Sequence, residues 1–206
     1  MLLAARDLNP RAVAQVLVTA REVHGLVPAL EEVVWPAMRA VGTYWADTGS
    51  GVGDEHVLTT AVASWLHREE QTAGPPTRRG RVLLACGPAD LHTLGLQAFG
   101  VLPAAQGFDC RTLGARTPVD VLRQAVEDVQ ASSVVVVSHF DSARPAAVTA
   151  VKAVATTAAR VYFAGAAFDA SRSRAGVPGT YLGDSLSAAA AHLAVTATRQ
   201  SEGIDS

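Results

Sequence analysis

The chain has 206 residues, of which 49% are hydrophobic and 17% are charged, and its formal net charge is -2. This composition is typical of a globular protein with one large or two small domains, and it excludes a disordered chain. No basic stripe is long enough to follow a phosphate backbone, so we expect no direct nucleic-acid partner. No apolar stretch reaches the ~18 residues of a membrane span, so we expect no membrane partner. The sequence begins without the pattern of a signal peptide, and Cys86 and Cys110 are expected to be reduced thiols, which indicates a cytoplasmic protein.

Residues 1–72 are predicted to form a small helical bundle. Apolar residues recur at helical spacing in three stretches, which lie at 10–25, 28–41 and 54–66, and residues 1–7 are a candidate for a fourth, short helix. Asn9 is a favourable N-cap, and Gly25 is a favourable helix end. Pro36 lies inside the second helix and is expected to kink it.

The pattern changes at residues 73–80, where two prolines and two glycines predict an interdomain linker. Residues 81–206 then alternate between apolar runs and helical segments. Strands are expected at 81–86, 110–114, 133–138, 160–165 and 180–183, and helices at 92–105, 118–130, 143–159 and 184–200. Thr117 is the expected N-cap of the helix at 118–130. The predicted fold class is α/β: a helical bundle cap followed by a flavodoxin-like, doubly wound sheet of five parallel strands.

The loop after the first predicted strand carries the pattern Asp90-Leu91-His92-Thr93-Leu94-Gly95. A carboxylate that accepts one imidazole N–H fixes the tautomer and makes the other ring nitrogen a better metal ligand. Ligands of such sheets bind beyond the carboxyl ends of the strands, which is where this loop is expected. The alternative is an ordinary surface pair or helix cap, because short motifs of this kind are common.

Small residues follow two other predicted strands. Ser138 ends the third strand, and Gly165 and Ala166 end the fourth. They would leave an open slot between the loops, although ordinary turn chemistry also explains them. Together with Asp90-x-His92-x-x-Gly95, they resemble the cobalamin-binding domain of the methionine synthase and mutase superfamily. The resemblance implies that His92 is the lower cobalt ligand and that Asp90 hydrogen-bonds it. It also implies that Gly95, Ser138 and Gly165 line the channel for the nucleotide tail, with Ala166 in place of a second glycine. Leu91 and Thr93, which flank His92, are further expected cofactor-binding residues.

The helical half carries a second motif, in which nine residues separate Trp45 from Glu55-His56. This spacing resembles the Trp-x9-Glu-His motif of cobalamin photoreceptors of the CarH and LitR type. The resemblance implies that the bundle covers the upper face of the corrin, with Trp45 over the adenosyl group of adenosylcobalamin and Glu55 and His56 beside it. The alternative is that Trp45 belongs to the core, Glu55 favours a helix N-terminus through its charge, and His56 has no role.

The sequence departs from the photoreceptor pattern in two places. No helix-turn-helix domain precedes the bundle, so we expect a stand-alone module and not a self-contained repressor. Ala46 follows Trp45 where DNA-binding members often carry a histidine, so any second imidazole ligand must come from elsewhere. His56 is a candidate for it, whereas His139 is expected near the lower loops.

These observations favour a non-enzymatic light sensor that holds adenosylcobalamin and acts on an unidentified protein partner. The resemblance also implies a homo-oligomer, either a dimer or a tetramer, and allows biliverdin as a second chromophore, although neither cysteine is obviously placed to link it. The first alternative is a corrinoid methyl-carrier protein of a methyltransferase system. The second is a cobalamin-binding antirepressor, which differs from the sensor only in its output.

Overall fold

The computed structural model of the protein describes residues 1–48, 51–78 and 80–202, without the side chains of residues 45–48 and 197–202. The chain divides into two compact units, Met1–Thr72 and Ala73–Ser206. Each unit has a hydrophobic core of its own. None of the described helices is long and apolar enough to cross a membrane.

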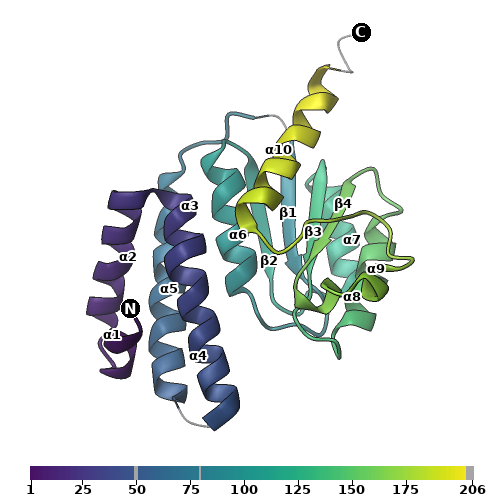
Figure 1. The fold of residues 1–206 in the computed structure, drawn as a ribbon. Helices are drawn as coiled ribbons and strands as arrows, with labels where there is room; N and C mark the ends of the chain where they lie inside the picture. Colours follow the sequence, from purple (N-terminus) through teal and green to yellow (C-terminus); the bar gives the residue numbers. More distant parts are fainter. Residues whose placement is uncertain (49–50, 79, 203–206) are drawn as a thin grey trace. The chain divides into compact units, whose positions relative to one another are not determined.

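The first unit is helical (Figure 1). Its elements are α1 (Leu2–Arg6), α2 (Pro10–His24), α3 (Leu26–Pro28), a π-helical segment η1 (Ala29–Val34), α4 (Trp35–Thr48) and α5 (Val52–Thr72). Helix α5 packs against α1, α2 and α4. The helices bury their apolar side chains against one another to form the core. Buried core residues of this unit include Val13, Leu17, Leu30, Leu58 and Trp65.

The predicted kink at Pro36 takes the form of a change in helix type. Proline has no N–H to donate, so a helix that contains it must lose one regular hydrogen bond. The chain is π-helical over Ala29–Val34, and the backbone N–H of Trp35 donates to Leu30 five residues earlier. Helix α4 then begins at Trp35, so Pro36 occupies its first turn, where the missing donor costs least.

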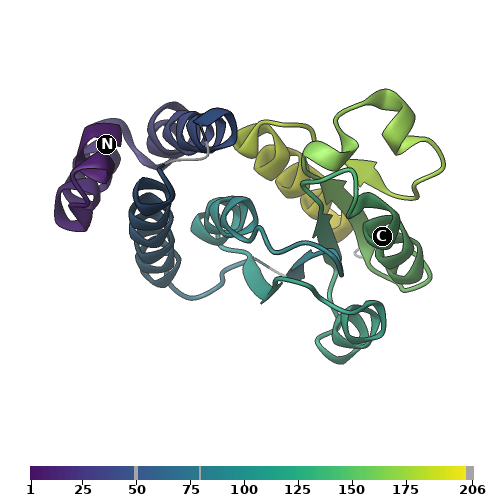
Figure 2. The same ribbon diagram turned by 90° about the horizontal axis from the view of Figure 1, so that it is seen from below.

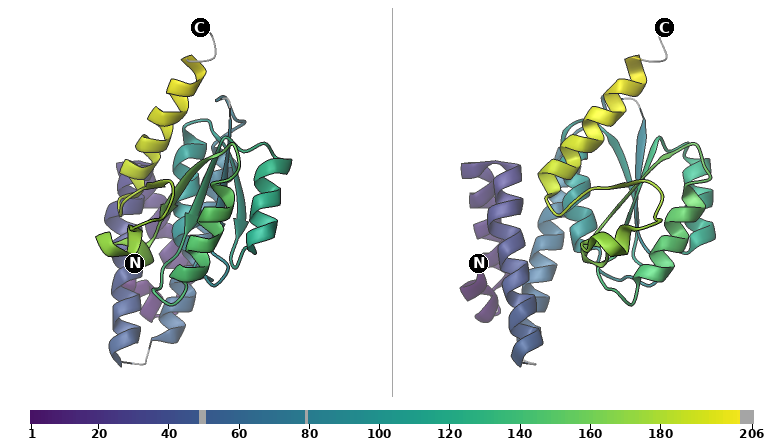
Figure 3. Two further views of the ribbon diagram at one scale, coloured as in Figure 1. Left: turned by 90° about the vertical axis from the view of Figure 1, so that its right-hand side faces the viewer. Right: turned by 45° about the vertical axis from the view of Figure 1, so that its right-hand side comes forward.

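The second unit is a five-stranded parallel sheet in the order β2-β1-β3-β4-β5, which confirms the predicted fold class. The strands are β1 (Arg81–Cys86), β2 (Asp109–Gly114), β3 (Ser133–Val137), β4 (Arg160–Ala164) and β5 (Thr180–Tyr181). Helices α6 (Leu94–Ala105) and α10 (Leu186–Glu202) cover one face, and α7 (Val119–Asp128) and α8 (Arg144–Val154) cover the other (Figures 2 and 3). The central strand β3 is buried along its whole length, as its run of valines indicates.

The helices of this unit begin one or two residues later than predicted, and the starts of α6 and α7 show local reasons for this. Helix α6 begins at Leu94 and not at His92, because the backbone N–H of His92 donates to the Asp90 side chain instead of joining a helix. Thr117 does not cap α7: its hydroxyl donates to the Gly114 carbonyl oxygen at 3.2 Å, and Pro118 is the N-cap residue. In both cases a side chain near a strand end bonds locally and delays the helix.

The register of the sheet fixes which loops meet. Cys86, the last residue of β1, pairs with Val137, the last residue of β3. The chain therefore leaves both strands at the same level of the sheet. The crossover from β1 to β2 uses α6 on one face and that from β2 to β3 uses α7 on the other, so the topological switch point lies between β1 and β3.

Candidate functional site

The centre of the candidate site is the carboxylate of Asp90, whose side chain is 0% exposed. A turn after β1 positions it, in which the backbone N–H of Asp90 donates to the Gly87 carbonyl oxygen at 3.0 Å. Oxygen Oδ1 then accepts two hydrogen bonds from His92, one from its backbone N–H at 2.8 Å and one from Nδ1 at 3.0 Å. The structure thus contains the Asp90–His92 contact that the motif implies.

A second imidazole, which the sequence motif did not include, shares the same carboxylate. Oxygen Oδ2 of Asp90 accepts the backbone N–H of His139 at 2.6 Å and its Nδ1 at 2.9 Å. His139 lies two residues beyond the last residue of β3, and the β1–β3 register brings it next to the Asp90 loop. The sequence placed His139 near this edge of the sheet but gave no signal of the contact, because 49 residues separate the two.

The charge of Asp90 follows from these bonds. Burial by itself raises the pKa of a carboxyl group, but the hydrogen bonds from His139 and His92 outweigh it, and the net effect is a pKa well below its usual range. Asp90 is therefore a carboxylate at neutral pH. An ionised carboxylate only accepts, so the Nδ1 atom of each ring carries a hydrogen, and the neutral form of each imidazole has its lone pair on Nε2.

The His92 ring is presented to solvent with apolar neighbours. Its side chain is 57% exposed although its Asp90 partner is fully buried. Phe140 packs its ring edge-on against the His92 ring with the centroids 4.7 Å apart, and Phe140 and Leu91 are themselves more than half exposed. A fixed lone pair therefore stands on a surface that can also contact a flat, partly apolar ligand.

Ser138 and Gly165 lie beside this cluster. The Ser138 hydroxyl is completely buried and has no hydrogen-bond partner among the described residues. Gly165 has φ +100°, and a Cβ there would overlap the backbone carbonyl of Ser138. The close approach of these two segments therefore requires glycine at position 165. A buried hydroxyl without a partner, as at Ser138, is unusual in a protein interior.

The other residues of the predicted lower site occupy ordinary positions. Thr93 is the N-cap residue of α6 but makes no side-chain cap bond, and Gly95 lies in the first turn of that helix. Ala166 is exposed and begins the 3-10 turn η2 (Ala166–Phe168). Behind the loop, burial and then the Asp90 charge raise the pKa of the Cys86 thiol to about 12, so this cysteine is protonated and unreactive at neutral pH.

The predicted upper-ligand residues belong to the helical unit. Glu55 is half-buried in the first turns of α5 and accepts a 3.3 Å hydrogen bond from the Thr59 hydroxyl, whereas His56 is exposed. The side chain of Trp45 and that of Ala46 lie outside the described residues. The contacts of Trp45 and the consequence of Ala46 therefore stay predictions.

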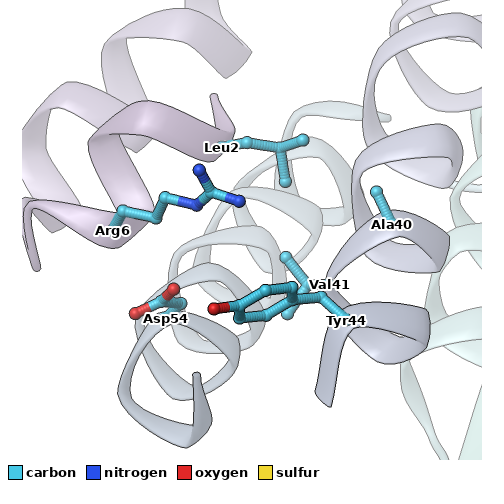
Figure 4. Close-up of a pocket in the computed structure, with 6 residues that line it drawn as sticks. All are labelled: Leu2, Arg6, Ala40, Val41, Tyr44 and Asp54. Atoms are coloured by element: carbon cyan, nitrogen blue, oxygen red, sulfur yellow. The ribbon is translucent and has the colours of Figure 1, made fainter. Parts of the chain in front are cut away.

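A small pocket lies within the same unit (Figure 4). Its lining residues, which come from α1, α4 and α5, are Leu2, Arg6, Ala40, Val41, Tyr44 and Asp54. The guanidinium carbon of Arg6 is 5.4 Å from the centroid of the Tyr44 ring. Tyr44 and Asp54 immediately precede Trp45 and Glu55 in the sequence, and Glu55 is not among the described lining residues.

The described residues contain no cluster of three or more His, Cys, Asp or Glu side chains that could hold a metal ion by itself. The arrangement can supply one axial nitrogen donor whose tautomer is fixed in advance.

Comparisons with known sequences find a relative that matches part of the chain. No protein-family model matches the chain. Over 133 residues, or 61% of the chain, it is 31% identical to the HTH-type transcriptional repressor CarH of Myxococcus xanthus, and it spans only 42% of that relative's length.

Solved structures are similar at lower sequence identity. The Methanosarcina barkeri monomethylamine corrinoid protein is 13% identical, with a TM-score of 0.71 over 94% of this chain and 95% of that chain. A cobalamin-binding protein of Desulfitobacterium hafniense DCB-2 is 20% identical, with a TM-score of 0.49 over 94% of this chain and 95% of that one. The first likeness shows that the two chains share a fold.

Proposed function

We propose that the sheet unit binds a cobalamin and that Nε2 of His92 is the lower axial ligand of its cobalt. The observation that carries the proposal is the bond between Nδ1 of His92 and the buried Asp90 carboxylate at 3.0 Å. This bond directs the lone pair to Nε2 of an exposed ring. The similarity to CarH and the shared fold of the monomethylamine corrinoid protein support the same assignment.

The residues around His92 fit such a group. The exposed side chains of Leu91 and Phe140 provide apolar contact area for a corrin beside the ligand ring. The Ser138 hydroxyl is buried without a partner among the described residues, so it can serve a polar group that enters between the loops. Gly165 keeps that approach free of a side chain.

The proposed output is a light-dependent signal to another protein, without catalysis by the chain. Bound at this site, an alkylcobalamin supplies a cobalt–carbon bond that light can cleave. Trp45, Glu55 and His56 match the motif that the photoreceptor resemblance assigns to adenosylcobalamin, and the similarity to CarH supports it. A homo-oligomer and a bound biliverdin are further parts of this proposal that rest on the resemblance alone.

A corrinoid methyl carrier is an equally supported alternative. The specific observation in its favour is the TM-score of 0.71 to the monomethylamine corrinoid protein, which extends over almost the whole of both chains. In a carrier, the upper-face residues would need only to shield a methyl group. A methyltransferase would then be the protein partner.

The test of cobalamin binding compares His92→Ala with His67→Ala, an exposed histidine of α5 that serves as the control. We expect His92→Ala to bind cobalamin at least about 100-fold more weakly, because loss of the ligand exceeds the tenfold to hundredfold cost of losing a supporting contact. The Co(II) form should also lose the ¹⁴N coupling from its EPR spectrum. Equal affinity and an unchanged spectrum would overturn the proposal.

The test of the output uses the unaltered protein loaded with adenosylcobalamin in the dark. Illumination followed by absorption spectroscopy and sizing chromatography should give a photolytic spectral change and an altered mass if the protein is a sensor. Preference for methylcobalamin, with methyl transfer to a thiol and no mass change, would favour the carrier. Adding biliverdin to the same assay tests the second chromophore.

A further inference from the structure

The Asp90 carboxylate binds two histidines in the same way. His92 gives its backbone N–H and Nδ1 to Oδ1 at 2.8 and 3.0 Å, and His139 gives its backbone N–H and Nδ1 to Oδ2 at 2.6 and 2.9 Å. The two rings lie with their centroids 5.8 Å apart. One negative charge is therefore divided between two imidazole donors.

The sharing of the Asp90 charge is important because the carboxylate is buried. The Asp90 side chain is 0% exposed, so it depends on these four donors and not on bulk water. A hydrogen bond to an ionised group in a buried site is strong, and the loss of one donor leaves more of the charge for the others. Each oxygen carries one ring donor, so the strength of the Asp90–His92 bond depends on whether the His139 bond is present.

We infer that His139 is a positioning residue that moderates the donor strength of His92 by sharing its carboxylate. The inference rests on the proposed role of His92 as cobalt ligand. A carboxylate that pulls harder on Nδ1–H makes Nε2 a stronger base and a stronger metal ligand. The hydrogen bonds from His139 reduce the negative charge that Asp90 presents to Nδ1–H of His92. The Asp90–His92 bond that fixes the His92 tautomer is kept.

Two substitutions at this position separate the hydrogen bond from the space it fills. His139→Leu places a methyl group where Nδ1 lies, whereas His139→Asn places an amide N–H donor at the same distance from Cβ. Both keep the backbone N–H that donates to Oδ2 at 2.6 Å. His139→Asn therefore acts as the conservative rescue.

The first measurement needs no cofactor. In the cobalamin-free protein, we expect the Nδ1–H proton resonance of His92 to move downfield in His139→Leu and to stay near its original position in His139→Asn. An unchanged resonance in a folded His139→Leu protein would overturn the inference. The same shift in both variants would also overturn it, because it would show a merely structural effect.

The second measurement uses the protein loaded with cob(II)alamin. We expect His139→Leu to increase the ¹⁴N coupling in the EPR spectrum and to lower the Kd several-fold, and His139→Asn to match the unaltered protein. Failure of the unaltered protein to bind cobalamin would overturn the proposed function. The coupling between His139 and His92 would still be tested independently by the proton resonance of the cofactor-free protein. If His139→Leu does not fold, introducing His139→Asn alone must leave both readouts unchanged, and a changed readout would overturn the inference.

Discussion

At the scale of single residues, Asp90 determines what the site can do. Its carboxylate is excluded from water and is held by four N–H donors from two histidines. The same bonds set the tautomer of His92 and keep the charge of Asp90 in place. A residue that performs both tasks should affect stability as well as ligand binding.

The substitution Asp90→Asn tests this role through its pH dependence. The pKa of Asp90 is lowered in the folded protein, so its ionisation stabilises the fold fully above the unfolded value of ~3.9 and progressively less as the pH falls below it. We expect the variant to be about 2 kcal/mol less stable at pH 7, because it leaves buried donors poorly paired. Urea unfolding at pH 7 and pH 3.5 should show this difference shrinking in acid, and a difference that grows in acid would contradict the assignment.

At the scale of elements, the site is built from loops that leave β1, β3 and β4 at one edge of the sheet. The loop after β3 lies against the turn after β4, where the N–H of Ala167 donates to the Ser138 carbonyl oxygen at 3.1 Å. Gly165 makes this approach possible, because its φ of +100° and the overlap of any Cβ with Ser138 both exclude a side chain.

Gly165→Ala should therefore destabilise the protein by about 3 kcal/mol, which combines an unfavourable φ with a backbone overlap. Gly183→Ala is the matched control, because Gly183 also has a positive φ of +81° but a Cβ there would meet nothing within 4 Å. We expect the control to cost about 1 kcal/mol. Thermal or urea unfolding measures both, and equal costs would show that the contact with Ser138 is unimportant.

At the scale of the whole molecule, the chain has two units with separate cores and separate predicted tasks. Asp90, His92 and His139 all belong to the unit Ala73–Ser206, and Glu55 and His56 belong to the unit Met1–Thr72. The lower ligand can therefore be tested apart from the residues assigned to the upper ligand.

A fragment of residues 73–206 should fold cooperatively, because its sheet is covered on both faces by helices of the same unit (Figure 2). We expect the fragment to bind cobalamin with the same ¹⁴N coupling in the Co(II) form as the whole chain, and to lose any discrimination between adenosylcobalamin and methylcobalamin. Circular dichroism, EPR spectroscopy and binding titrations measure these properties. Retained discrimination would show that Trp45, Glu55 and His56 do not contact the upper ligand.

The sequence by itself determined the fold class and the first half of the site. Strands alternating with helices are a local pattern, and so is the pair Asp90-x-His92, in which both partners belong to one loop. Such features depend on neighbours in the chain, which periodicity and spacing report. The exact starts of α6 and α7 were missed, because side chains at Asp90 and Thr117 compete for backbone groups there.

The tertiary structure alone decided that His139 shares the Asp90 carboxylate and that the Ser138 hydroxyl has no partner among the described residues. The first follows from the parallel register that pairs Cys86 with Val137 and brings residues 49 positions apart within hydrogen-bonding distance. That register pairs segments that are far apart in the sequence, so the spacing of residues within one loop does not report it.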